Sequence, residues 1–500
     1  MKTQRHAGIL LHPTSLPGPG GIGTLGAELR MFLDFLAKAG FSLWQILPLT
    51  LPAAGNSPYT SCSAFAGNHL LLDLRQLQQE GDLPAEATLD PPFPKDHVAF
   101  EHLIPWKETL LDQAAACFFS QGHTSRLEAF WQFCDSTYWL HDYALFQALK
   151  QHYRNSPWHL WPEHLARRTP KAMAQATEQL GRQVGAQKYR QWQFYKQWQA
   201  VRSSAAERGI TIIGDLPIFV AHDSVDVWCN RQLFLLDQTG QPTAVAGVPP
   251  DYFSATGQLW GNPLYDWDAM AQENYAWWVA RLRSLLNQSD LIRIDHFRGF
   301  EAVWQVPATE KTAVNGTWVA GPAAHFFDAV HTQLGHLPFI AEDLGVITPE
   351  VEALRDHYAL PGMKILQFAF DAGASNPYLP HNHIPNSVVY TGTHDNDTTR
   401  GWYDSLLAKA RQRIHDYLGV TGTNPVQDLI RTALMSVAQM AIIPMQDIFE
   451  LPTAARMNRP GSALGNWCWR YTEEQLQEPL VEQYAALNQR YGRWHARSRP

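Results

Sequence analysis

Short apolar runs recur along the chain, and several end at a glycine, a proline or an aspartate. Between them lie longer stretches in which apolar residues recur at helical spacing. Apolar runs of about 4–8 residues bounded by turn residues predict buried strands, and helical stretches between them predict parallel strands covered by helices. Eight such runs predict an α/β fold, a closed (β/α)8 TIM barrel. The predicted strands are residues 8–11, 42–47, 211–215, 291–295, 339–342, 365–368, 387–390 and 442–446.

The predicted strands are unevenly spaced, and the long gaps predict insertions on the carboxyl-terminal face of one catalytic barrel unit, residues 1–500. Residues 74–187 are expected to form a mostly helical insertion, and residues 188–207 the helix that returns to the third strand, with Gly209 at its C-cap. Residues 220–267 are rich in proline, glycine and aromatic side chains, which predicts a loop-rich insertion. Residues 301–324 form a third, small insertion.

Composition narrows the class of protein. Hydrophobic residues make up 45% of the chain and charged residues 17%, which is typical of a globular protein. The net charge is −8 and no basic stripe is present, so nucleic acid is not an expected partner. Five cysteines without C-x-x-C spacing indicate a reducing compartment, the cytoplasm, and argue against a zinc cluster. No apolar run reaches the roughly 20 residues of a membrane span.

One acidic residue stands at the end of each of three predicted strands. These residues are Asp295, Glu342 and Asp395. Because the carboxyl ends of parallel barrel strands face one pocket, we expect the three carboxylates to converge there. A pair of carboxylates is what the cleavage of a glycosidic bond requires.

Arg293 and Asp295 lie two residues apart, so both side chains should point to the same side of the strand. The guanidinium is expected to lower the pKa of Asp295, which suits a nucleophile for an anomeric carbon. Glu342 ends an apolar strand near another carboxylate, so its pKa should be raised, as a general acid requires. Asp343 competes with Glu342 for that role.

Asp395 lies in the polar run Gly-Thr-His-Asp-Asn-Asp-Thr at residues 392–398. Its carboxylate could hold sugar hydroxyls and stabilise an oxocarbenium-like transition state. Two alternatives stay open at this point. His394, Asp395 and Asp397 could ligate a metal, or they could cap the next helix.

At these residues the chain resembles the amylomaltases, bacterial 4-α-glucanotransferases related to the α-amylase superfamily. The resemblance extends over essentially the whole chain. The matching stretches are S-P-Y at 57–59, G-D-L-P-I-F-V at 214–220, G-Q-L-W-G-N-P at 257–263, R-I-D-H-F-R-G at 293–299, A-E-D-L-G at 341–345, G-T-H-D-N-D-T at 392–398, N-R-P-G at 458–461 and G-N-W at 465–467.

The resemblance implies a retaining double-displacement mechanism without a metal or organic cofactor. Asp295 would form the glucosyl-enzyme, Glu342 would act as acid and then base, and Asp395 would hold the distorted sugar. Malto-oligosaccharides and glucose would serve as donor and acceptor, and residues 249–263 would cover the bound glucan. The further sugar contacts implied are Tyr59, Asp215, Trp260, Arg293, Asp371, His394 and Asn466.

Three other activities compete with this interpretation. A retaining α-glucan hydrolase would use the same three acids. A metal-dependent barrel hydrolase would typically carry H-x-H on its first strand, where this chain has the single His12. A non-catalytic glucan-binding protein would have no need of intact Asp295, Glu342 and Asp395.

Overall fold

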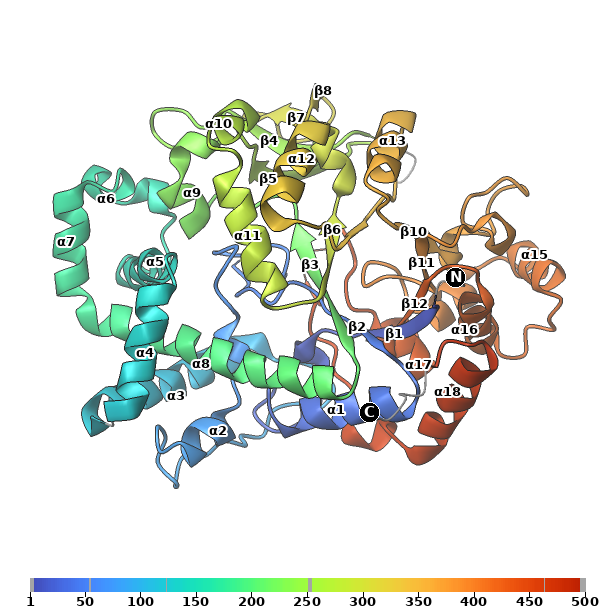
Figure 1. The fold of residues 1–500 in the computed structure, drawn as a ribbon, viewed down its shortest axis with the longest axis horizontal. Coiled ribbons are helices and arrows are strands. Elements are labelled where there is room, and N and C mark those ends of the chain that lie inside the picture. Colours follow the sequence, from blue (N-terminus) through green and yellow to red (C-terminus); the bar gives the residue numbers. More distant parts are fainter. Residues whose placement is uncertain (1–3, 54, 123, 251–253, 463, 495–500) are drawn as a thin grey trace.

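Eight parallel strands form a closed barrel in the core of the molecule (Figure 1). This computed structural model describes residues 4–53, 55–122, 124–250, 254–462 and 464–494. The strand order is β1-β12-β11-β10-β9-β6-β3-β2, and β1 closes the barrel by pairing with β12. The predicted (β/α)8 fold is confirmed. The strands are β1 (His6–Leu10), β2 (Leu43–Gln45), β3 (Thr211–Pro217), β6 (Leu291–Asp295), β9 (Phe339–Ala341), β10 (Gly362–Ile365), β11 (Ser387–Tyr390) and β12 (Met440–Pro444).

Three strands begin earlier than predicted, and β1 does so by two residues, at His6. β10 begins at Gly362, and the residues predicted as strand after Ile365 form a 3-10 helix, Leu366–Phe368. Lys364 interrupts the apolar run, so the start of this strand could not be recognised from the sequence. In the structure the lysine Nζ lies 5.8 Å from the centre of the Tyr378 ring. β12 begins at Met440, and helix α17 (Met445–Ile448) starts directly after Pro444, so residues 445 and 446 are helical rather than extended.

Amphipathic helices surround the barrel. In α1 (Ala27–Lys38), for example, the apolar face is buried: its residues recur at helical spacing and each is 0% exposed, namely Leu29, Phe32, Leu33 and Leu36. Each of the other helices that come after strands buries at least one apolar residue. These are α9 (Val225–Cys229), α10 (Trp267–Gln272), α11 (Ala276–Leu286), α12 (Ala323–Leu334), α13 (Pro349–His357), α14 (Thr399–Ser405), α15 (Ala408–Leu418), α16 (Pro425–Met435) and α18 (Glu478–Arg490).

The chain between β2 and β3 is mostly helical, and much of it lies to one side of the barrel (Figure 1). The long helix α8 (Gly181–Glu207) returns to β3 and begins seven residues before the predicted position of 188. Gly209 follows it with φ of +70°, a left-handed conformation that glycine adopts without strain. The preceding helices are α2 (Leu74–Gln79), α3 (Phe100–Gln121), α4 (Thr124–Ser136), α5 (Leu140–His152), α6 (Glu163–Ala166) and α7 (Pro170–Gln179).

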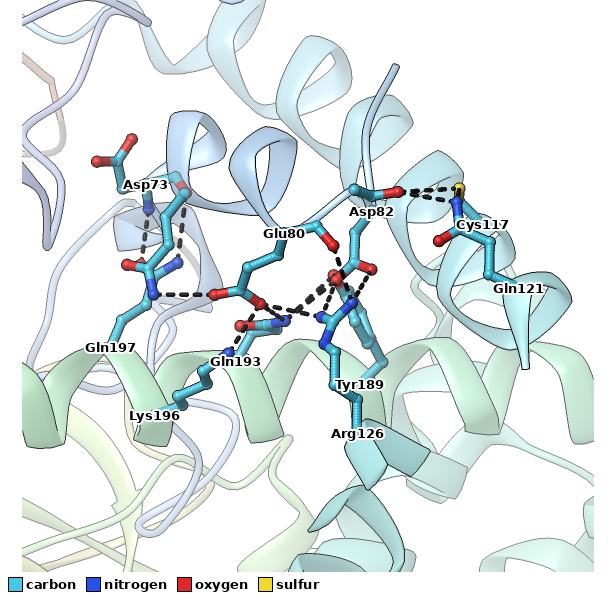
Figure 2. A network of polar contacts seen from close by, with 12 residues as sticks. Asp73, Glu80, Asp82, Cys117, Gln121, Arg126, Tyr189, Gln193, Lys196 and Gln197 are labelled. Atoms are coloured by element: carbon cyan, nitrogen blue, oxygen red, sulfur yellow. Dashed lines mark hydrogen bonds and ion pairs between the residues drawn. The ribbon is translucent and has the colours of Figure 1, made fainter. Parts of the chain in front are cut away.

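A network of charged side chains fastens this helical region to α8 (Figure 2). Arg126 of α4 donates hydrogen bonds to both oxygens of Asp82, at 2.7 and 2.5 Å, and to Glu80 at 2.9 Å. From α8, the Tyr189 hydroxyl donates to Asp82 at 2.6 Å, and Lys196 lies 2.8 Å from Glu80. Asp82 has no exposed side-chain surface, so these partners make its buried charge tolerable.

A four-stranded antiparallel sheet, in the order β5-β4-β7-β8, lies beside the barrel. It joins two segments that the sequence presented as separate insertions. β4 (Ala244–Val248) pairs with both β5 (Gln258–Pro263) and β7 (Ala302–Pro307), and β7 pairs with β8 (Thr317–Ala320). The region predicted as loop-rich therefore contains two strands of this sheet.

The seam between β1 and β12 is held by a residue near the end of the described chain. Arg493 is 0% exposed. Its guanidinium donates to the carbonyl of His6, 487 positions away, at 2.8 Å, and to the carbonyls of Leu434 at 2.7 Å and Ser436 at 2.9 Å. The arginine therefore ties the start of β1 to the turn that leads into β12.

Candidate active site

A buried ion cluster links the ends of β3 and β6. The strand register pairs Asp215 with Arg293. Arg293 Nη1 donates to both oxygens of Asp215, each at 2.8 Å, and Nη2 donates to Asp295 Oδ1 at 3.0 Å. Asp295 keeps 30% of its side chain exposed. Among the described residues it accepts no other hydrogen bond, so Asp295 Oδ2 is open to the site.

The Asp215 carboxylate is engaged by protein partners, although Asp215 lines a pocket together with Tyr59. Its side chain is 0% exposed, and both of its oxygens are bonded to Arg293. The Tyr59 hydroxyl also donates to Asp215 Oδ2, at 2.6 Å. The sugar contact predicted for Asp215 stays a prediction; the sequence could not show that its carboxylate lies beneath the Arg293 guanidinium, where it positions Arg293 and Tyr59.

Burial raises the pKa of both Asp295 and Glu342. Arg293 acts in the opposite direction on each, but the loss of water around the carboxylates outweighs it. The charges of Asp215, Glu342 and Asp395 raise the pKa of Asp295 further. The lowered pKa predicted for Asp295 is thus wrong, and the raised pKa predicted for Glu342 is confirmed. Because the charges of Glu342 and Asp395 act on the pKa of Asp295, the three predicted acids lie close to one another around one site.

Glu342 follows β9 and is fixed by backbone donors. Its Oε2 accepts from the backbone N–H of His296 at 2.7 Å, and its Oε1 from that of Leu344 at 3.1 Å. The first of these contacts holds the carboxyl beside Asp295. Asp343, which competed for the acid role, is 7% exposed and accepts from Arg355 at 2.5 Å. Glu342 is therefore the carboxyl that faces the site.

Asp395 is held by two residues that the sequence analysis did not name as site residues. Asn458 Nδ2 donates to Asp395 Oδ1 at 2.6 Å, and Arg456 donates to the Asp395 carbonyl at 2.5 Å. His394 Nε2 lies 3.5 Å from Asp395 Oδ2. The N-cap of α14 is Thr398, so the capping role considered for Asp395 falls to another side chain.

Tyr59 lies beside these acids as part of an aromatic group. Its ring stacks on His394 with centroids 5.1 Å apart and 14° between the planes. Trp467 contacts both rings, at 5.8 Å from Tyr59 and 5.9 Å from His394. One face of the predicted sugar platform is therefore covered by His394. Trp467 was missed as a residue, although the G-N-W stretch that contains it was noted.

Trp260 approaches the site from the antiparallel sheet. Its ring lies edge-on to His296, at 4.9 Å, and is 38% exposed. Trp260 lies within β5, so residues 258–263 of the predicted covering loop form a strand. Residues 251–253 of that loop lie outside the described residues.

Two predicted sugar contacts are less closely tied to the acids. The Asn466 amide bonds with the backbone of Arg459 and with the Ser462 carbonyl, which shapes its own loop. Asp371 is exposed and accepts from Asn376 at 3.1 Å. No hydrogen bond between described residues joins either side chain to the three acids.

Comparison with known proteins decides the family. A family model described as 4-alpha-glucanotransferase matches residues 11–476. The chain belongs to the 4-alpha-glucanotransferase family. The 4-alpha-glucanotransferase of Thermus thermophilus is 48% identical, covering 95% of this chain and 96% of its own, and that of Synechocystis sp. is 49% identical, covering 99% of each. The structure of amylomaltase from Streptococcus agalactiae in complex with acarbose matches with a TM-score of 0.95 at 37% identity, covering 98% of this chain and 100% of that one.

Membership of the 4-alpha-glucanotransferase family makes the protein an enzyme that transfers units of α-1,4-glucan, as the sequence resemblance implied. The hydrolase and the non-catalytic binding protein are not favoured. Within the parts of the chain that the structure describes, no three His, Cys, Asp or Glu side chains are grouped to hold a metal ion. In the same parts, no helix has the length and apolar character to cross a membrane.

Proposed function

We propose that this 4-alpha-glucanotransferase works by a retaining double displacement in which Asp295 is the nucleophile, Glu342 the acid and base, and Asp395 a holder of sugar hydroxyls. The observation that carries this assignment is the Asp295 carboxylate. One oxygen is held by Arg293, and the other is open beside Glu342 and Asp395. The guanidinium stabilises the anion, and the open oxygen is free to attack.

In the first displacement, Asp295 Oδ2 bonds to the anomeric carbon of the donor glucan. The bond from that carbon to the glycosidic oxygen breaks, and Glu342 gives its proton to the departing oxygen. Burial raises the pKa of both Glu342 and Asp295, so the pair holds one proton near neutral pH. The Arg293 guanidinium, bonded to Asp295 Oδ1 at 3.0 Å, favours the charge on Asp295 and so the proton on Glu342, as this step requires. In the second displacement, Glu342 takes the proton from the 4-hydroxyl of an acceptor, whose oxygen attacks the same carbon and releases Asp295.

Malto-oligosaccharides are the proposed donors, and glucose or another glucan the acceptor. The acarbose complex of the Streptococcus agalactiae amylomaltase supports a site shaped for such sugars. Incubation with maltotriose alone should give glucose together with longer oligomers. A steady rise in reducing ends without chain lengthening would instead identify a hydrolase.

A fluorinated glucosyl donor tests the nucleophile directly, because it forms the covalent intermediate and releases it slowly. The labelled peptide should contain Asp295, and Asp295→Asn should abolish both labelling and transfer. Labelling of Glu342 or Asp395 would reverse the assigned roles. Binding of maltotriose without any turnover by the wild type would support a glucan-binding protein.

A cytoplasmic location is also proposed. All five cysteines are free, and sparse unpaired thiols are typical of proteins from a reducing compartment. Fractionation of the native host, followed by an activity assay of each fraction, tests this placement.

A further inference from the structure

A pocket behind the catalytic acids brings two histidine side chains together. It lies among the ends of β1, β11 and β12, and its lining includes His12, His394 and Ser15. The volume that this pocket offers to water is about 30 Å³, and one water molecule needs roughly 10–15 Å³. Polar walls and sufficient room are the two conditions for an ordered internal water.

His12 presents an unsatisfied acceptor to this pocket. It follows β1 and is 6% exposed. Its Nδ1 has no hydrogen-bond partner among the described residues, and the Leu47 carbonyl raises the His12 pKa as an acceptor near the ring, which favours the proton on Nε2. Burial lowers the His12 pKa to about 3, so the ring is neutral near neutral pH and Nδ1 carries a free lone pair.

His394 is arranged in the same way. It is 6% exposed, and its Nδ1 is likewise without a partner in the described parts of the chain. Its Nε2 lies 3.5 Å from Asp395 Oδ2, and a neighbouring carboxylate favours the proton on that nitrogen. Burial lowers the His394 pKa, so this ring is also neutral.

The charged groups that share the pocket already have protein partners. Asp447 accepts from the hydroxyls of Thr391 and Thr399, each at 2.6 Å. Asp397 accepts from Thr453 at 2.9 Å, and Arg456 donates to backbone carbonyls. The two imidazoles that line the pocket are thus each left with an unpartnered Nδ1. Two acceptors cannot bond to each other, and a molecule with two O–H donors is needed to satisfy both.

We propose that a water molecule in this pocket donates one hydrogen bond to His12 Nδ1 and the other to His394 Nδ1, so that His12 is a positioning residue for the reaction. The water holds His394 in the tautomer whose Nε2–H points toward Asp395 and the sugar. The link to catalysis rests on the proposed function, since it assumes that His394 faces the sugar. The water and the tautomer themselves do not depend on it.

Two measurements on the wild type test the arrangement. Long-range ¹H–¹⁵N spectra of the histidine-labelled enzyme, assigned with His12 and His394 variants, should show both rings neutral and protonated on Nε2 near pH 7. A high-resolution crystal structure should show one water within hydrogen-bond distance of both Nδ1 atoms. A protonated Nδ1 on either ring, a metal ion between them, or a dry pocket would overturn the proposal.

The positioning role is tested with three variants. His12→Leu removes the acceptor, so the His394 tautomers should mix and kcat on maltotriose should fall about tenfold with little change in KM, as when an outer partner of a functional histidine is lost. His12→Gln keeps a side-chain acceptor and should recover most of that loss. Ser15 lines the same pocket, and Ser15→Ala should leave kcat and the His394 tautomer unchanged.

An unchanged kcat and tautomer in folded His12→Leu would refute the positioning role. If that variant does not fold, the His12→Gln kinetics and the wild-type spectra decide. Failure of maltotriose lengthening would reject the proposed function while leaving the tautomer result intact, so the two proposals fail separately.

Discussion

Replacing Asp215 by asparagine tests whether this carboxylate touches the sugar or positions Arg293. The substitution keeps the shape of the side chain and removes its charge. Asp215 has no exposed surface and makes two 2.8 Å contacts with Arg293. The variant therefore leaves a buried guanidinium with Asp295 as its remaining ion-pair partner.

Breaking a buried pair by removing one partner destabilises a protein by about 3–5 kcal/mol. The lower end applies here. The negative charge of Asp215 raises the pKa of Asp295, so its removal favours ionised Asp295, which then compensates Arg293 in part. At about 2.1 cal/mol/K per residue, a chain of 500 residues has an unfolding entropy of about 1 kcal/mol/K, and the Tm should fall by about 3 °C.

Differential scanning calorimetry and maltotriose kinetics on Asp215→Asn measure both consequences. A displaced Arg293 should lower kcat by about tenfold or more and change KM little, because the lost interaction acts on the reacting carboxylate. Asp142→Asn is the matched control. Asp142 pairs with Arg168 at 2.6 Å but is 38% exposed, so its loss should lower the Tm by less than about 1 °C. An unchanged Tm and kcat in Asp215→Asn with a raised KM would refute the positioning role and support the sugar contact.

Three further perturbations follow from the site. Asn458→Ala removes the 2.6 Å hydrogen bond to Asp395; a bond to a charged group contributes about 1.5–3 kcal/mol, so kcat/KM should fall roughly 10- to 150-fold, and a loss below threefold would remove Asn458 from the site. Tyr59→Phe keeps the ring on His394 and should retain more activity than Tyr59→Ala; equal losses would show that the hydroxyl, and not the stacking, matters. Burial raises the folded-state pKa of Glu342, so the stability that this group contributes is complete at acid pH and is lost as the pH rises through that pKa. Glu342→Gln should therefore be inactive yet melt above the wild type near about pH 8, the difference vanishing near about pH 4, and a constant difference across that range would contradict the pKa shift.

The barrel could be predicted because its strands are short apolar runs with polar ends, as in Leu291–Asp295. The start of β10 was missed at Lys364, and the second sheet was missed because its antiparallel partners lay far apart in the chain. β4 and β7 are such partners. β4 (Ala-Val-Ala-Gly-Val) and β7 (Ala-Val-Trp-Gln-Val-Pro) are apolar, but they stand in segments interpreted as insertions, and the pairing that stabilises each cannot be recognised from its own residues.

The convergence of the three acids could be predicted from position alone, since Asp295 ends β6 and Glu342 and Asp395 come after β9 and β11. Their electrostatics could not, because the pKa of Asp295 depends on how many carboxylates share its space and on how little water remains. Asn458 was missed for a related reason: its contact with Asp395 spans 63 positions. The N-R-P-G stretch that contains Asn458 was recognised in the sequence, but the sequence did not show that this side chain points toward Asp395.

The seam closed by Arg493 has a consequence for how the protein is made. On a ribosome that adds roughly 5–20 residues per second, the 487 positions between His6 and Arg493 take about 25–100 s to emerge. During that interval the nascent first strand has an unpaired edge on the side that β12 will occupy, and such edges recruit other chains. Expression yield should therefore depend on keeping the exposed edge of β1 from pairing with other chains until β12 has been synthesised.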